Sequence, residues 1–358
     1  MIATTEDLQE HLRLAMQVEL STIPPYLYAM YSVADPHAES ARLVLSIVAE
    51  EMLHLSLAAN LLASIGGKPD FLDMGLLPRH PGVLAHHKPE LPLHLVPMSV
   101  EAVRSTFMVI ERPGARNAPV EDDEYHSLGQ FYGAVEAAFE RLAAEGPLFV
   151  PGSEAHQLSG GHFYGPVEFD AADSGELVTV TDLASAREAI EVIVHQGEGL
   201  GEHKWADPSH QELTHYAKLL RIAEGKVAVG GVLPVRTDPR VADYPPDVAR
   251  IATMANASYR ALFHVLDDLY RPIEDKGFHV SALYGLMKRV LGPLARHLTT
   301  IDLGDGTVAS VTFEPVDLGP EPGRTLAAMA AEVAEAEPSL ARTLSSLLDG
   351  TALGRTAA

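Results

Sequence analysis

The chain has 358 residues and contains no cysteine, so disulfides, thiolate metal sites and cysteine nucleophiles are excluded. Its formal net charge of −23 repels nucleic-acid phosphates and anionic membranes, and we expect neither as a partner. The sequence lacks an apolar run of the roughly 20 residues that a membrane span needs, and it does not begin like a signal peptide. We therefore expect a cytoplasmic protein in which carboxylates and imidazoles hold any metal.

The first two predicted helices are long and amphipathic. Apolar residues recur at helical spacing over residues 5–31 and again over residues 38–65. Gly66-Gly67 is typical of the end of a helix and closes the second one. Pro24-Pro25 removes backbone donors inside the first helix, so we expect a bend there.

Further helices follow, separated by segments rich in Gly, Pro and His. These segments predict insertions at about 68–123 and 146–182. In the second insertion, the letters LVTVT alternate like a strand. Near the C-terminus, TIDLGDGTVASVTF predicts a small hairpin around Asp305-Gly306. The remaining predicted helices cover residues 99–111, 124–145, 183–198, 209–224, 247–271, 279–298 and 324–349, the last interrupted at Pro338.

These elements predict a mainly α fold with two parts. We expect residues 1–225 to form a four-helix bundle with long inserted loops. Residues 226–358 then form an additional C-terminal helical region, which contains the small β-hairpin and packs on the bundle. The linker near residues 226–246 carries Gly and Pro and is the best candidate boundary.

Acidic residues interrupt the apolar faces of the first two helices. Glu19 lies in phase with the apolar residues of its helix, and Glu51 does so in the second helix. His54 follows Glu51 by three residues, so both side chains point the same way. Burying such charges is costly unless they are paired or bound to a metal. This pattern predicts Glu19, Glu51 and His54 as metal ligands.

The same pattern recurs later in the chain. Glu198 closes the helix predicted over 183–198, and Glu212 with His215 repeats the Glu-x-x-His spacing. One Glu from each of two helices, and one Glu-x-x-His from each of two others, is how ferritin-like bundles hold two metals. Carboxylate and imidazole donors suit iron or manganese. We therefore predict two iron ions per chain, with Glu198, Glu212 and His215 completing the ligand set.

Several of these residues have other interpretations. Ser209 and Glu212 also fit a capping box, in which the Glu bonds back to the first backbone amide of the helix. Glu198 lies at a helix end and can instead be exposed. Glu136 is the rival for the third-helix ligand, although packing at the core edge suits it better. Glu50 lies off the apolar face and suits a supporting or surface position.

Several blocks of the sequence resemble a known family. The segments VELSTIPPYLYAMYS, EEMLHLSLAANLLASIGGKP, LGQFYGAV, VIVHQGEG and ELTHYAKLLRI look like those of the ferritin-like domain family of iminophenyl-pyruvate dimer synthase, which includes violacein and indolocarbazole biosynthesis enzymes. The resemblance covers roughly residues 5–224. It implies secondary metabolism, with oxidative coupling or oxygenation of a small amino-acid-derived molecule.

Together these observations predict a non-haem di-iron oxidase or oxygenase. Its co-substrate would be O₂ or peroxide, and its substrate a small aromatic or amino-acid-derived metabolite. The alternatives are a ferritin-like iron-binding or ferroxidase protein without an organic substrate, and a metal-free bundle that scaffolds pathway enzymes. A second copy of the chain or other pathway enzymes are the protein partners we consider, and the sequence assigns no catalytic residue beyond the ligands.

Overall fold

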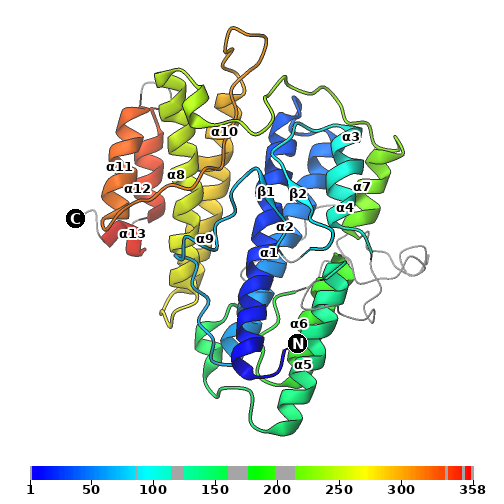
Figure 1. The fold of residues 1–358 in the computed structure, drawn as a ribbon. Helices are drawn as coiled ribbons and strands as arrows, with labels where there is room; N and C mark the ends of the chain where they lie inside the picture. Colours follow the sequence, from blue (N-terminus) through cyan, green and yellow to red (C-terminus); the bar gives the residue numbers. More distant parts are fainter. Residues whose placement is uncertain are drawn as a thin grey trace.

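The computed structural model confirms a mainly α fold built around a bundle of helices (Figure 1). One hydrophobic core runs through the molecule, from Ile2 at one end of the chain to Leu353 at the other. The structure describes residues 2–85, 87–113, 125–159, 176–197, 214–334, 338–348 and 351–355.

Two long neighbouring helices, α1 (Thr5–Ser32) and α2 (Glu39–Ser64), form the centre of the bundle. The Thr4 side chain caps α1 by accepting a hydrogen bond from the backbone N–H of Asp7. The helix continues through Pro24-Pro25 without ending, and the bend expected there stays a prediction. Helix α2 is the helix among the described residues that is long and apolar enough to cross a membrane, but 83% of that stretch is buried inside the protein.

The other side of the bundle is divided between shorter helices (Figure 1). At one end, α5 (Leu128–Glu145) packs on α1, and α6 (Leu183–Gln196) packs on α2. At the other end, α7 (His215–Ala223) packs on α2 and on a segment that precedes α5. This segment consists of α3 (Val100–Ala102), the π-helical turn η1 (Val103–Phe107) and α4 (Met108–Ile110). The division gives α1 and α2 different partners along their length.

The C-terminal helices cover one side of this bundle (Figure 1). The Arg296 guanidinium donates to the carbonyl oxygens of Tyr31 and Val33 at the end of α1, and Tyr270 donates to Ser56 O on α2 at 2.9 Å. The helices are α8 (Pro246–Leu269), α9 (Lys276–Leu286), the π-helical turn η4 (Met287–Leu291), α10 (Gly292–Leu298), α11 (Pro322–Glu332), α12 (Leu340–Leu348) and α13 (Ala352–Arg355). Pro338 lies between α11 and α12, as predicted.

Strand structure is minor among the described residues. The two-stranded antiparallel sheet pairs β1 (Gly82–Val83) with β2 (Pro92–Leu93) in the first insertion. The predicted C-terminal hairpin is a tight reversal with one antiparallel bridge between Asp302 and Val308. Short 3₁₀ turns, η2 (Ser153–His156) and η3 (Val241–Asp243), lie in the connections.

The strand predicted at LVTVT, residues 177–181, is wrong. Its backbone groups bond to side-chain amides instead of to another strand. Gln157 bonds both backbone groups of Val180, through its Nε2 at 2.8 Å and its Oε1 at 2.7 Å. The fully buried Asn60 of α2 donates to Val178 O at 2.8 Å and to Leu158 O at 2.7 Å. These amides satisfy the segment where it lies against α2.

The helix predicted over 209–224 also starts later than expected. Thr214 has an extended backbone, and its side chain accepts from Ala217 N, so it caps α7 and His215 is the first helical residue. Residues 209–213 lie outside the described part of the chain. The expectation that one continuous helix runs from Ser209 through His215 is therefore corrected, because the cap at Thr214 begins the helix at His215.

Replacing Asn60 with leucine should destabilise the fold. The change removes the donors to Leu158 O and Val178 O and the acceptor of Leu158 N. Leaving such buried groups unpaired should lower the free energy of unfolding by about 2–4 kcal/mol. Urea denaturation measures this loss. Leu45→Ala on the exposed side of α2 is the control and should change stability by about 0.5 kcal/mol or less; an equal loss in both variants would contradict the assignment.

Acid should destabilise the protein through His80. Burial lowers the pKa of this imidazole from 6.5 to about 4, with a smaller contribution from His94 and an opposing one from Asp238. Between pH 6.5 and 4 the unfolded chain therefore binds a proton that folded His80 does not, so stability is full above this window and falls within it. The loss from His80 should be on the order of 2–3 kcal/mol. Denaturation of His80→Gln across this range should show a shallower decline, whereas exposed His37→Gln should match the unmodified protein.

Candidate metal centre

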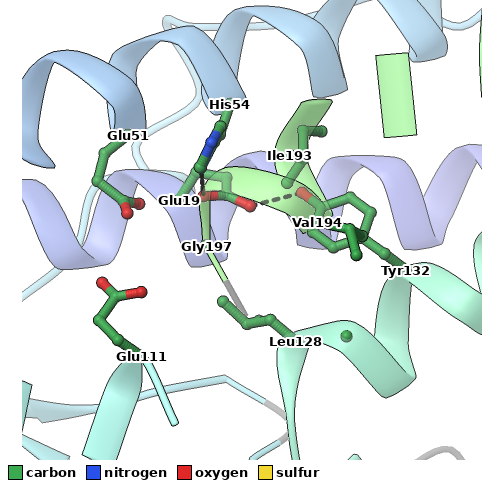
Figure 2. Close-up of a pocket in the computed structure, with 10 residues that line it drawn as sticks. Glu19, Glu51, His54, Glu111, Leu128, Tyr132, Ile193, Val194 and Gly197 are labelled. Carbon is green, nitrogen blue, oxygen red and sulfur yellow. Dashed lines mark hydrogen bonds and ion pairs between the residues drawn. The ribbon is translucent and has the colours of Figure 1, made fainter. Parts of the chain in front are cut away.

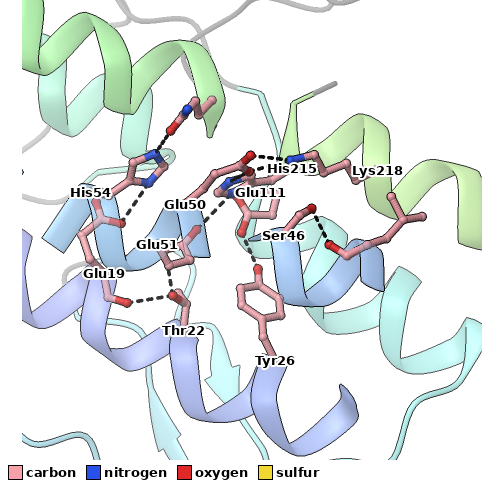
Figure 3. Close-up of polar contacts among 12 residues, drawn as sticks. Glu19, Thr22, Tyr26, Ser46, Glu50, Glu51, His54, Glu111, His215 and Lys218 are labelled. Atoms are coloured by element: carbon pink, nitrogen blue, oxygen red, sulfur yellow. Dashed lines mark hydrogen bonds and ion pairs between the residues drawn. The ribbon is translucent and has the colours of Figure 1, made fainter. Parts of the chain in front are cut away.

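Two buried clusters of carboxylates and imidazoles meet inside the bundle (Figures 2 and 3). The first contains Glu19, Glu51 and His54, and the second contains Glu51, Glu111 and His215. In each cluster, one possible ligand atom from each residue lies within 4.8 Å of the others. Glu51 belongs to both clusters, so its carboxylate lies between two adjacent positions that could hold a metal ion.

The first cluster is built from α1, α2 and α5. Helical spacing places Glu51 and His54 on the same face of α2, opposite Glu19 of α1. His54 Nδ1 lies 3.5 Å from Glu19 Oε2, and the Tyr132 hydroxyl of α5 donates to Glu19 Oε1 at 2.5 Å. Thr22 Oγ1 lies 2.9 Å from Glu51 Oε2 and 2.8 Å from Glu19 O, and its single proton can go to either. Each carboxylate is thus fixed by a hydroxyl from a neighbouring turn or helix.

The second cluster joins α2 to the segments at the other end of the bundle. Glu111 directly follows α4, and His215 is the first residue of α7. His215 Nδ1 lies 2.9 Å from Glu51 Oε1 and 3.3 Å from Glu111 Oε2. Tyr26 of α1 donates its hydroxyl proton to Glu111 Oε1. The capping of α7 at Thr214 therefore determines where this imidazole stands.

Behind the two imidazoles lie further polar groups (Figure 3). His54 Nε2 lies 3.0 Å from Gln196 Oε1 at the end of α6. His215 Nε2 lies 2.8 Å from Glu50 Oε2. Lys218, one turn further along α7, places its Nζ 2.6 Å from both oxygens of Glu50. The two rings stack with their centroids 5.4 Å apart, so the centre is enclosed on this side.

The charges of these residues fit bound cations. Among the described residues, the carboxylates of Glu19, Glu50, Glu51 and Glu111 face the ammonium of Lys218, which leaves a formal charge of −3 when both imidazoles are neutral, as metal binding requires. Burial raises the pKa of Glu51 to about 7, and the charge of Glu111 adds to this effect. Burial favours neutral His215, yet the carboxylates, Glu111 first, raise its pKa well above the usual value. Excess negative charge in a dry interior is the condition that a cation relieves.

Glu19 differs from Glu51 in its electrostatics. Burial, the largest single influence, favours the neutral form of Glu19. The hydrogen bond and charge of His54, helped by Tyr132, oppose burial and lower the pKa of this carboxyl. Glu19 is therefore favoured as the charged carboxylate, the form that binds a cation. The nearby charge of Glu111 disfavours the charged form of Glu51.

The cavity between these carboxylates is small. It has a volume of about 10 Å³, room for roughly one water-sized group. Figure 2 shows Glu19, Glu51 and Glu111 directed toward it, with Leu128, Ile193 and Val194 on its apolar side. Such a space suits ions and small oxygen species rather than an organic molecule.

The structure brings four of the six predicted ligands together, namely Glu19, Glu51, His54 and His215. Glu198 and Glu212 lie outside the described residues, so both stay predictions. The rival Glu136 is away from the clusters on α5, partly exposed, with its Oε1 4.0 Å from Arg187 Nε. Glu50 is buried in the supporting position that the sequence left open.

Sequence reasoning missed Glu111. This residue ends the helix predicted over 99–111 and precedes Arg112-Pro113, where a surface position is the ordinary expectation. The available signal was spacing, because Glu111 follows the fully buried Phe107 by four residues and Val103 by eight. It therefore extends the buried stripe of that helix by one more turn.

Comparisons with known proteins agree with the helical-bundle fold. A family model described as ferritin-like matches residues 12–224. Dichlorochromopyrrolate synthase of Lentzea aerocolonigenes is 25% identical over 87% of the chain, and 2-imino-3-(indol-3-yl)propanoate dimerase of Chromobacterium violaceum is 28% identical over 84%. The alignments span 36% and 31% of these relatives, so the chain covers about a third of their length. These findings confirm the predicted family resemblance.

A solved structure shows the same fold. A ferritin-like protein from Caulobacter vibrioides has a TM-score of 0.62 and 24% sequence identity. The match covers 87% of this chain and 99% of the other. At this identity the likeness supports the fold alone.

Glu51→Ala should abolish most metal binding, because this carboxylate serves both clusters. Metal-free protein titrated with Co²⁺ should retain little of its binding, with affinity falling about 100-fold or more, since even outer partners of ligands contribute 10–100-fold. Bound metal is measured by elemental analysis after gel filtration. Glu136→Ala is the matched control on α5 and should bind normally; unchanged binding in Glu51→Ala would show that the clusters are not the metal site.

Proposed function

The chain belongs to the ferritin-like family, and from this premise we propose that it is a non-haem di-iron oxidase or oxygenase. Its substrate is a small aromatic or amino-acid-derived metabolite, and its setting is natural-product biosynthesis. O₂ or peroxide serves as the co-substrate. The similarity to two biosynthetic enzymes supports the enzyme class.

The observation that carries the proposal is the shared carboxylate of Glu51. Two ligand clusters with one common carboxylate are what a pair of adjacent metal ions requires. All members are carboxylates or imidazoles, and this mixture without thiolates suits iron and manganese. Glu19 and His54 would hold one ion, Glu111 and His215 the other, and Glu51 both. Glu198 and Glu212 remain proposed additional ligands.

When bound, the ions would supply the electrons and binding positions for reducing oxygen species. The surrounding residues fix the geometry and exclude bulk water. The hydroxyls of Tyr132 and Tyr26 hold the outer oxygens of Glu19 and Glu111. Gln196 holds the ring of His54 from behind. Burial of every member keeps the centre in a low-dielectric interior, where these contacts act strongly.

The relatives suggest the class of substrate. One of them is named for joining two molecules of an arylalkyl imino acid. Joining two such molecules forms one bond between them and removes two hydrogen atoms. Those two protons and two electrons convert peroxide to two waters, or O₂ to hydrogen peroxide. We propose this class of oxidative coupling for the present chain. Because the chain aligns with about a third of the length of each relative, its own substrate is identified by experiment.

The small cavity favours a second candidate function. Among the described residues, the space at the carboxylates accepts an ion or a water-sized molecule. A ferroxidase without an organic substrate would need no more room. The two functions differ in whether an organic molecule is consumed.

Oxidase activity is tested by loading metal-free protein with Fe²⁺ under argon. A 2-imino-3-arylpropanoate is then added with O₂ or peroxide. We expect substrate-dependent consumption of oxidant and a product with the mass of two substrates minus two hydrogens. Glu51→Ala should lose about 100-fold or more of this rate, and Glu136→Ala should keep it. Rapid Fe²⁺ oxidation with unchanged imine would instead favour the ferroxidase. Bound iron that oxidises neither in O₂ or peroxide nor with the imine present would refute the oxidase and the ferroxidase alike.

A further inference from the structure

The two candidate ion positions are closely matched in the residues that face them (Figure 3). Each is formed by one imidazole Nδ1 and two carboxylates, with Glu51 common to both. Each outer carboxylate also accepts a hydrogen bond from a buried tyrosine, Tyr132 for Glu19 and Tyr26 for Glu111. Among the described residues, the formal charge around the two positions is therefore the same.

The two ion positions differ in the group that lies behind each imidazole ring. Both rings turn Nδ1 toward the carboxylates of the two clusters and Nε2 away from the clusters. The Nε2 of His54 faces the neutral amide oxygen of Gln196 at 3.0 Å. The Nε2 of His215 faces the carboxylate of Glu50 at 2.8 Å. The contact between His215 Nε2 and Glu50 is a close approach to a charged group, whereas His54 Nε2 is hydrogen-bonded to a neutral amide. A carboxylate behind a ligating histidine increases the basicity of the ring toward the metal through its negative charge, which the amide lacks.

Lys218 makes this buried carboxylate possible. Glu50 alone would be an uncompensated charge in the interior, which is unfavourable by several kcal/mol. Lys218 is 1% exposed, and its Nζ lies 2.6 Å from both oxygens of Glu50. It stands three residues after His215, so the first turn of α7 brings the imidazole and the ammonium to the same carboxylate of Glu50. The pair adds no net charge and acts through the position of the His215 ring.

We propose that the Glu50–Lys218 pair makes the ion position at His215 the tighter of the two, so that metal ions occupy it first. This inference rests on the two-ion centre of the proposed function. Glu50 and Lys218 are positioning residues, since each acts through His215. The order of filling follows from the groups behind the imidazoles, because the inner residues that the structure describes are matched.

The order of filling is measured by titrating metal-free full-length protein with Co²⁺ in the absence of oxygen. Visible absorption and calorimetry should show two steps in the unmodified protein. Glu19→Gln removes a carboxylate only from the position at His54, so it should retain the tight step. Glu111→Gln removes one only from the position at His215, so it should retain the weak step. These two variants assign each step to a position.

The double variant Glu50→Gln with Lys218→Met removes both charges together and avoids a lone buried charge. It should weaken the tight step about 10–100-fold and leave the weak step unchanged. Lys218→Arg preserves the ion pair and should restore most of the tight step. Lys226→Met, which removes a largely exposed lysine just after α7, is the control and should change neither step. Thermal unfolding of each metal-free variant confirms that the protein is folded.

The outcomes separate this inference from the proposed function. Two steps of equal affinity in the unmodified protein would overturn the inference while leaving a two-ion centre. Equal weakening of both steps in the double variant would also overturn it, as would a tight step that survives in Glu111→Gln. Binding of one ion or none by the unmodified protein would instead refute the two-ion centre.

Discussion

Burial of four carboxylates in one apolar core is the constraint on which the rest of the structure depends. Glu19, Glu50, Glu51 and Glu111 are each at most 9% exposed. An isolated buried carboxylate is strongly unfavourable unless hydrogen bonds and opposite charges compensate for it. Hydroxyls, imidazoles and one buried lysine surround the four, and they still leave an excess of negative charge that a metal ion can balance.

The arrangement of helices follows from this requirement. The long helices α1 and α2 supply Glu19, Glu51 and His54 in a fixed register, and one face of α1 adds the hydroxyls of Thr22 and Tyr26. The shorter helices opposite them approach at two levels (Figure 1). The lower level contributes support from Tyr132 and Gln196. The upper level contributes Glu111 and His215, so the clusters lie where the two levels meet.

The residues that would ligate metal ions form two similar sets, whereas the residues behind the two imidazoles differ in charge. This distinction matters for the proposed two-ion centre, because similar ligands alone would not give the two ions different affinities. The chain aligns with about a third of the length of its two biosynthetic relatives.

The sequence by itself determined the helical fold and, among the described residues, four of the five cluster members: Glu19, Glu51, His54 and His215. Glu19, Glu51 and His54 were predictable because they lie on two uninterrupted helices, where spacing alone decides which side chains share a face. Tertiary structure decided the rest. Glu111 comes from a helix broken by a π-turn, and Lys218 reaches Glu50 only because α7 packs on α2. The strand predicted at 177–181 failed for a similar reason, since the buried amides of Asn60 and Gln157 replaced the partner strand. Helical periodicity is a local property that can be predicted from the sequence. Contacts between segments far apart in the chain depend on how the whole chain packs.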